Sequence, residues 1–123
     1  AETEAFIAID TVSLIPDFIE QFVETPCDAH AGEFETSTSL ANRENAVVKE
    51  RIIKPQITLP KSKYTKIGLK EAGPKVSWAF RTKEISSTGV IGDPTKASKE
   101  KGEKAWKLAI ERLAELLKEL DSM

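Results

Sequence analysis

The last quarter of the chain carries the pattern that most limits how it can fold. Apolar residues recur there at helical spacing, which predicts a long helix that begins after a cap at Thr95 or Ser98. Lysine and glutamate alternate on the opposite face, and Glu100 and Lys104 are spaced four residues apart as an ion pair. Because one face of this helix is apolar, the rest of the fold must cover it. The apolar face comprises Trp106, Ala109, Ile110, Leu113, Leu117 and Leu120.

The preceding segments predict what packs against this helix. Residues 5–9 form a short apolar run, the pattern of a strand in a parallel sheet that is covered on both faces. Ser13 can cap a following helix whose apolar side chains extend to Phe22. Residues 76–80 alternate like another strand, in which Trp78 either packs in the core or offers a flat surface to substrate. We therefore predict an α/β fold, a layered sandwich in which helices flank a mostly parallel sheet.

The only histidine of the sequence, His30, lies in a polar cluster that spans residues 28–37. Histidine changes its charge near neutral pH, and carboxylates within reach hold its tautomer and raise its basicity. The cluster is therefore typical of a residue that transfers protons or binds a metal. The alternative is a lone histidine on a polar loop, ahead of a helix that we expect over residues 33–42.

Two glutamates of this cluster have different explanations. Glu33 would stand in the first turn of the expected helix, where the helix dipole favours a negative charge, so it needs no functional role. Glu35 lies further from His30 along the chain and can reach it only through a tight turn, which Gly32 permits. Glu35 is therefore the carboxylate that we expect beside His30.

Two segments resemble one enzyme family. Residues 30–37, His-Ala-Gly-Glu-Phe-Glu-Thr-Ser, resemble the His-Ala/Gly-Gly-x-x-Glu-Thr-Ser signature of the creatininase family of metal-dependent amidohydrolases. Residues 86–94 and 97–102 are similar to the last loop and closing helix of that family. Family members also carry, in an N-terminal half, a Glu-x-His...Asp element and a Gly-His-x-x-Asn element that bind a pair of divalent metals, and neither occurs here. We therefore expect residues 1–123 to be the C-terminal portion of a creatininase-like domain.

The resemblance implies a reaction and roles for particular residues. It implies hydrolysis of an amide or cyclic amide C–N bond by a metal-activated water, with His30 as proton shuttle and Glu35 as its catalytic partner. Asp28, Thr36 and Ser37 become candidates for substrate binding, alongside Trp78.

The metal and the partners follow from the same resemblance. One histidine and one cysteine cannot supply the usual ligands of a hydrolytic metal site. A divalent zinc, manganese or iron would therefore be held mainly by the N-terminal half or by a companion subunit. The resemblance further implies a small-molecule amide substrate and a homo-oligomer, a hexamer by family likeness. The alternative is a catalytically inactive creatininase-like subunit with an interaction or regulatory role.

Creatinine itself is doubtful as the substrate. Creatinine-hydrolysing members have a carboxylate immediately before the motif histidine and an aromatic residue shortly before that, where this chain has Ala29 and Pro26. Other relatives in this family are formylaminopyrimidine deformylases, a peptide-trimming enzyme and a hydrolase of inositol-derived ketoses. Among these, the resemblance favours a deformylase of the archaeal type or a sugar hydrolase.

Charge is distributed unevenly along the chain. Residues 1–45 hold ten acidic residues and one basic residue, whereas residues 46–123 hold seventeen basic and ten acidic ones. The basic part lacks the clustered arginines and stacking aromatics of a nucleic-acid-binding domain, so we do not expect a nucleic-acid partner. The asymmetry would instead suit contact between subunits or attraction of an anionic substrate.

The sequence also bears on location. No apolar run approaches the roughly 20 residues of a membrane span, and residues 1–4 lack the basic start of a secretory signal. We therefore expect a cytoplasmic protein with no membrane partner. Cys27 has no second cysteine to pair with in this sequence, and a small buried apolar role is favoured over that of a nucleophile.

Overall fold

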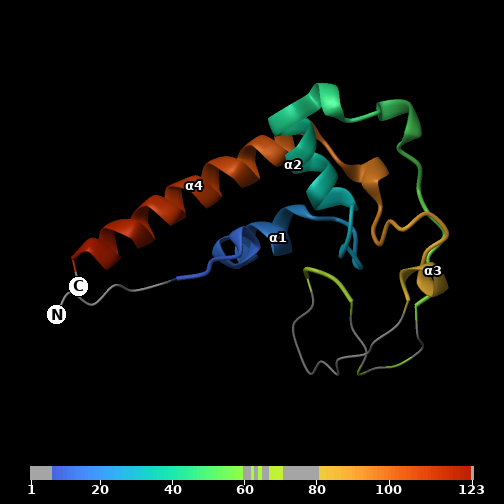
Figure 1. The fold of residues 1–123 in the computed structure, drawn as a ribbon, viewed down its shortest axis with the longest axis horizontal. Helices are drawn as coiled ribbons and strands as arrows, with labels where there is room; N and C mark the ends of the chain where they lie inside the picture. Colours follow the sequence, from blue (N-terminus) through green and yellow to red (C-terminus); the bar gives the residue numbers. More distant parts are fainter. Residues whose placement is uncertain (1–6, 60–61, 63, 65–66, 71–80, 123) are drawn as a thin grey trace.

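The computed structural model describes residues 7–59, 62, 64, 67–70 and 81–122. Regular secondary structure in these ranges is helical. Figure 1 shows the longest helix, α4, running from α2 past α1. The α-helices are α1 (Pro16–Phe22), α2 (Glu33–Arg43), α3 (Thr82–Ile85) and α4 (Lys99–Asp121), and the 3-10 helices are η1 (Thr11–Leu14), η2 (Glu44–Ala46), η3 (Lys49–Arg51) and η4 (Pro94–Lys96).

Helix α4 forms where the sequence predicts it. The Ser98 side chain caps the helix by accepting a hydrogen bond from the Lys101 backbone N–H at 3.1 Å. The predicted ion pair between Glu100 and Lys104 is present at 2.8 Å. None of the described helices, α4 included, is both long and apolar enough to cross a membrane.

The apolar face of α4 is covered unevenly. Ala105 and Ala109 are buried against α1 and α2 in the core. Trp106, Ile110 and Leu117 belong to the same predicted stripe, yet they are exposed. Within the described residues, therefore, the core covers part of the stripe and leaves the rest at the surface.

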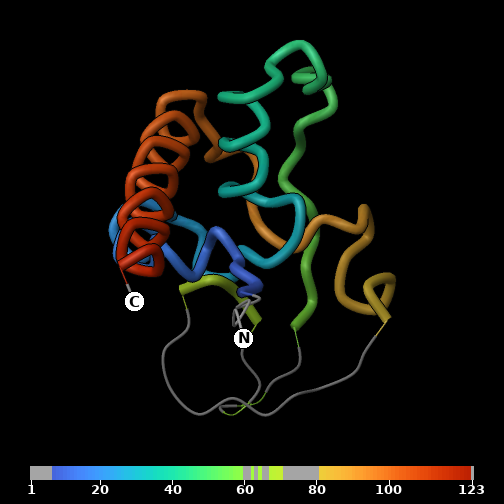
Figure 2. The backbone as a smooth tube through the Cα atoms, turned by 60° about the vertical axis from the view of Figure 1, so that its left-hand side comes forward, coloured from blue at the N-terminus to red at the C-terminus, as the bar shows by residue number. Residues whose placement is uncertain are grey.

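The core lies where α1, α2 and α4 meet, and Figure 2 shows these helices gathered on one side of the backbone trace. A single helix starting after Ser13 was expected here, but the chain forms η1 and then α1. The break falls at Ile15 because the proline at the first position of α1 disfavours helical geometry in the residue before it. The buried core side chains are Ile15, Phe18, Ile19, Val23, Phe34, Ala105 and Ala109.

The predicted α/β sandwich with a mostly parallel sheet is wrong. The described residues contain no strand, and their extended segments meet only in two isolated antiparallel bridges, His30 with Ile91 and Ile57 with Ser86. Ile7 and Ile9, from the run expected to be a buried strand, are exposed. A strand needs a neighbour along its length for its backbone hydrogen bonds, and these segments find single-residue partners instead. The strand expected over residues 76–80 lies outside the described residues, and so does Trp78.

Candidate functional site

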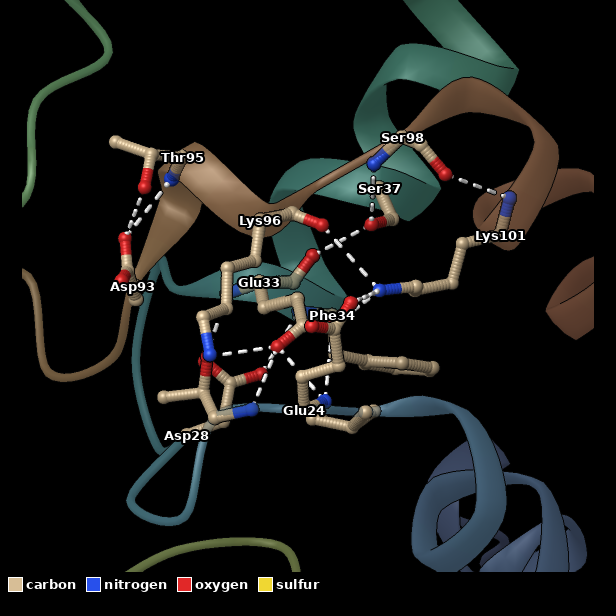
Figure 3. Close-up of polar contacts among 12 residues, drawn as sticks. Glu24, Asp28, Glu33, Phe34, Ser37, Asp93, Thr95, Lys96, Ser98 and Lys101 are labelled. Carbon is tan, nitrogen blue, oxygen red and sulfur yellow. Dashed lines mark hydrogen bonds and ion pairs between the residues drawn. The ribbon is translucent and has the colours of Figure 1, made fainter.

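A buried carboxylate at the start of α2 joins three parts of the chain. Glu33 is fully buried and accepts hydrogen bonds from the Glu24 N–H at 3.0 Å and from the Thr25 N–H at 2.7 Å. The Thr25 hydroxyl donates to it at 2.6 Å, and the Lys101 ammonium of α4 pairs with it. Lys101 also donates to the Lys96 carbonyl at 3.2 Å. Figure 3 shows these groups converging on one carboxylate, which links the end of α1 to α2 and α4.

Glu33 and Lys101 stabilise each other's charges. Burial raises the pKa of Glu33, but hydrogen bonds from Lys101 and Thr25 outweigh it and hold that pKa below its ordinary value. Burial lowers the pKa of Lys101, and the hydrogen bond to Glu33 reverses this and raises it. The interpretation of Glu33 as a simple helix-start charge is therefore incomplete, because it is one half of a buried ion pair.

Asp28 caps α2 from outside the helix. Its carboxylate is buried and accepts hydrogen bonds from the Glu33 and Phe34 backbone N–H groups, both at 2.7 Å. Gly32, at the N-cap position, has no side chain that could do this. A Cβ added to Gly32 would lie 1.8 Å from the Asp28 Oδ1, and one added to Gly92, whose φ is +151°, would lie 2.2 Å from it. One glycine from each family-like segment therefore makes room for Asp28, and burial raises the pKa of this carboxyl.

Ser37 lies at the contact between α2 and α4. It is fully buried, and its hydroxyl donates to the Glu33 carbonyl at 2.6 Å and accepts from the Ser98 N–H at 3.1 Å. The helices approach so closely that a Cβ on Gly102 would lie 2.0 Å from the Ser37 carbonyl oxygen. Substrate binding by Ser37 stays a prediction, and the contacts described here position helices.

His30 and Glu35 lie together at the surface. The His30 Nδ1 is 4.0 Å from the Glu35 Oε2, and both side chains are more than half exposed. Glu35 also accepts a hydrogen bond from the backbone N–H of Ala31, whose φ of +50° forms the turn together with Gly32. The prediction that Glu35 lies beside His30 is therefore confirmed, but the left-handed residue of the turn is Ala31 and not Gly32, whose φ is −89°. Thr36 follows on α2, and its hydroxyl lies 3.4 Å from the Ala31 carbonyl that accepts its hydrogen bond.

The exposed histidine stands on an ordered backbone. The His30 N–H donates to the Ile91 carbonyl at 3.0 Å, and the Ile91 N–H donates to the His30 carbonyl at 2.8 Å. These two bonds attach the first family-like segment to the second. The imidazole is thus accessible, while the main chain that carries it is held in place.

The His30–Glu35 pair borders two cavities, each of about 390 Å³. The first cavity lies between η1, α2 and α4, and core side chains such as Ile15 and Phe34 form its wall, together with buried Asp28. The second cavity lies between α2 and the η2–η3 segment. Besides the pair, it is lined by Ala31, Thr36, Ser39, Ala46, Val47, Val48, Arg51, Ile52, Val90 and Pro94.

The described residues do not assemble a metal centre. Nowhere in the described ranges do three or more His, Cys, Asp and Glu side chains converge in a way that could hold a metal ion. Asp28 directs both carboxylate oxygens to backbone N–H groups of α2. The donor set present here therefore does not fit a hydrolytic metal site.

Lys101 is the residue that the sequence analysis missed. It occupies the third position of α4, where the helix dipole disfavours a positive charge. A cation in that position signals a nearby acidic partner, and the buried Glu33 is that partner. The two lie 68 residues apart in the chain, so neither local pattern identifies the pair.

Comparisons with known proteins agree on one family. A family model described as creatininase, creatinine amidohydrolase, matches residues 10–117. The crystal structure of a Bacteroides fragilis protein named "putative creatinine amidohydrolase" matches with a TM-score of 0.69 and 27% sequence identity. That match covers 88% of this chain and 40% of the other, so this chain spans well under half of its structural relative. No curated protein matches.

These matches identify the class of protein: the chain is similar to the amidohydrolases that are named for creatinine. The chain belongs to the creatininase family. The resemblance read from residues 30–37 and from residues 86–102 is thereby confirmed.

Proposed function

We propose that this chain contributes the proton-transfer part of an amidohydrolase active site. In this proposal His30 delivers a proton to the nitrogen that leaves when an amide C–N bond is hydrolysed. The observation that carries it is the exposed His30 imidazole, 4.0 Å from the Glu35 carboxylate and at the rim of two cavities. Membership of the creatininase family supports the class of reaction.

Glu35 orients the His30 imidazole in this proposal. The Ala31 N–H holds the Glu35 carboxylate on the Nδ1 side of His30, which favours the tautomer with the proton on Nδ1. The Nε2 atom is then the one that accepts a proton and passes it on, and the carboxylate stabilises the positive ring. The 4.0 Å separation is longer than a hydrogen bond, and catalytic contacts of this kind tighten when substrate is bound.

Asp28 positions the loop in this scheme. Both of its oxygens are held by the N–H groups of Glu33 and Phe34, so it orders the turn that carries His30. Thr36, beside His30 on the second cavity, is the remaining polar candidate for contact with substrate.

We also propose that a divalent metal, zinc, manganese or iron, is held by the rest of the enzyme, on an N-terminal half or a companion subunit. The sequence supports this division, because it holds one histidine and one cysteine, too few for the usual ligands of a hydrolytic metal site. Zinc titrated into the 123-residue chain should therefore show no stoichiometric tight binding, because one imidazole and its neighbouring carboxylates do not close a tetrahedral site. Submicromolar binding of one zinc per chain would contradict the division.

We also propose that the chain is part of an oligomer. Trp106, Ile110 and Leu117 expose apolar surface on α4, and such surface is commonly covered by another subunit. Sedimentation of the purified chain should therefore show self-association or, with the companion present, a complex. A stable monomer that binds no hydrophobic dye would contradict this part of the proposal.

The test of His30 is substitution in the enzyme reconstituted from this chain and the metal-binding part. His30→Ala should lower kcat about 100-fold or more, as expected for loss of a general acid or base. Added imidazole should restore part of the activity, which a purely structural defect would not allow. Glu103→Gln, on the exposed side of α4, is the matched control and should leave kcat unchanged.

Unchanged turnover in His30→Ala would remove His30 from the mechanism. If the reconstituted assembly hydrolysed no amide at all, the chain would instead be an inactive creatininase-like subunit with an interaction or regulatory role.

A further inference from the structure

Arg51 lies at the same cavity as the His30–Glu35 pair, and its charge has no partner among the described residues. It ends η3 and lines the second cavity together with that pair. In the part of the chain that the structure describes, its guanidinium takes part in no hydrogen bond or ion pair. The neighbouring cations differ, because Lys49 pairs with Glu44 and Lys54 lies 3.4 Å from an Asp93 oxygen.

The lining of this cavity combines apolar surface with a few polar groups. Three valines, an isoleucine and a proline provide apolar surface, and the Thr36 and Ser39 hydroxyls add neutral polar groups. The charged or titratable side chains that line it are His30, Glu35 and Arg51. A ligand there would therefore meet apolar walls, one imidazole, one carboxylate and one guanidinium.

The chemistry of these groups selects the ligand. Glu35 accepts a hydrogen bond from the Ala31 N–H and faces His30, and among the described residues no ion pair joins it to Arg51. A guanidinium presents paired N–H donors that match the two oxygens of a carboxylate. Glu35 would repel the same carboxylate from the His30 end of the cavity, which orients the ligand.

We infer that the second cavity binds a small amide that carries a carboxylate, with the carboxylate on Arg51 and the amide group toward His30. This inference rests on the proposed function, whose substrate class it narrows. Arg51 is then a residue that determines specificity, and it takes no part in proton transfer.

The single histidine of the chain makes the inference measurable without turnover, because the imidazole signals in an NMR spectrum belong to His30 alone. The probes are succinamate, which has one amide and one carboxylate, and succinamide, its neutral diamide. Succinamate should shift the His30 signals saturably, and succinamide should bind about tenfold more weakly or worse because it lacks the charge-assisted contact.

Variants at two neighbouring cations isolate Arg51. Arg51→Gln should abolish the preference for succinamate, and Arg51→Lys should retain only part of it, since an ammonium does not match a carboxylate with two parallel donors. Lys49→Gln is the control: it removes an exposed cation of the same 3-10 helix outside this cavity and should leave the preference intact.

Equal binding of both probes by the unmodified chain would overturn the inference. So would a preference that survives in Arg51→Gln, or the lack of a saturable shift with either probe. A different result would contradict the proposed function alone. If the preference for succinamate depended on Arg51 but the reconstituted enzyme hydrolysed no amide, the binding site would stand and the proposed reaction would be wrong.

Discussion

The pair of Glu33 with Lys101 is buried, whereas the pair of His30 with Glu35, from the same short motif, is exposed. Glu33 has no exposed surface, and its carboxylate accepts hydrogen bonds from Glu24 and Thr25, which follow α1, and from Lys101 of α4. His30 and Glu35 are more than half exposed, and 4.0 Å separates the His30 Nδ1 from the Glu35 Oε2. The first pair stabilises the fold, and the second remains accessible to a ligand.

The difference shows how a short motif divides its tasks. Its histidine and second glutamate face the cavities, whereas its glycine, first glutamate and serine hold α2 against the rest of the chain. Residues of one chemical type, such as Glu33 and Glu35, therefore cannot be assigned a role from their type alone. The predictions below separate the two regions by measuring stability and activity independently.

Glu33→Gln should have the largest effect on stability. The substitution removes the buried partner charge of Lys101 and leaves it only the exposed Glu24 carboxylate, at 3.3 Å, and breaking a buried pair of this kind costs about 3 kcal/mol. Urea unfolding followed by circular dichroism, at one protein concentration for all variants, measures this loss. Glu100→Gln, which breaks the exposed pair with Lys104 on the same helix, is the control and should scarcely change the midpoint. Equal losses in the two variants would refute the distinction between buried and exposed pairs.

Gly92→Ala should cause the second-largest loss of unfolding free energy, about 2 kcal/mol. Its Cβ would lie 2.2 Å from the Asp28 Oδ1, so the carboxylate must leave the N–H groups that it caps. Gly89→Ala is the matched control, because Gly89 also has a positive φ, of +87°, but nothing lies within 4 Å of its added Cβ. The control should therefore show only backbone strain, about 1 kcal/mol. If both variants lost the same amount, contact with Asp28 would not be the reason for Gly92.

Lowering the pH should reduce the difference in unfolding free energy between the unmodified chain and Glu33→Gln. The pKa of Glu33 is lowered in the folded state, so its contribution to stability is complete above its ordinary pKa of 4.5 and is lost as the pH falls through the folded value. Asp28 has a raised pKa and the opposite trend; it is present in both proteins, so only the part of that raise that the Glu33 charge causes remains in the difference. Unfolding free energies measured at a series of pH values should converge below pH 4.5. A constant gap would mean that the charge of Glu33 is not what stabilises the fold.

Glu35→Gln should have the smallest effect on stability and a large one on turnover. Its carboxylate is exposed, so the unfolding midpoint should stay close to that of the unmodified chain. In the reconstituted enzyme, loss of the charge beside His30 should lower activity about 10- to 100-fold. If Glu35→Gln were destabilised but fully active, the structural role would belong to Glu35 and the assignment of the two glutamates would be wrong.

The sequence predicted local structure better than it predicted the sheet. The cap at Ser98, the extent of α2 and the turn that brings Glu35 to His30 all depend on near neighbours in the chain, and all three were predicted. The parallel sheet was not found in the described residues, because an apolar run such as residues 5–9 forms a strand only beside another strand.

The candidate site was predictable to a similar degree. His30 and Glu35 could be placed together because one turn connects them. Lys101 could not, since its contact with Glu33 depends on how α4 crosses α2. Catalysis by His30 and substrate binding by Asp28, Thr36, Ser37 and Trp78 stay predictions.

The contact between α2 and α4 also contributes a loop-closure entropy to the free energy of folding. It closes a loop, since the contact of Glu33 with Lys101 spans 68 residues and that of Ser37 with Ser98 spans 61. The entropy lost on closing a flexible loop grows only with the logarithm of its length, at about 0.6 kcal/mol for each doubling. Insertions in the exposed segment around Ile53 would therefore change stability little, while the crossing keeps the turn at His30 in place. A change of length at that exposed position would leave the contacts between α2 and α4 in place, and with them the turn that carries His30.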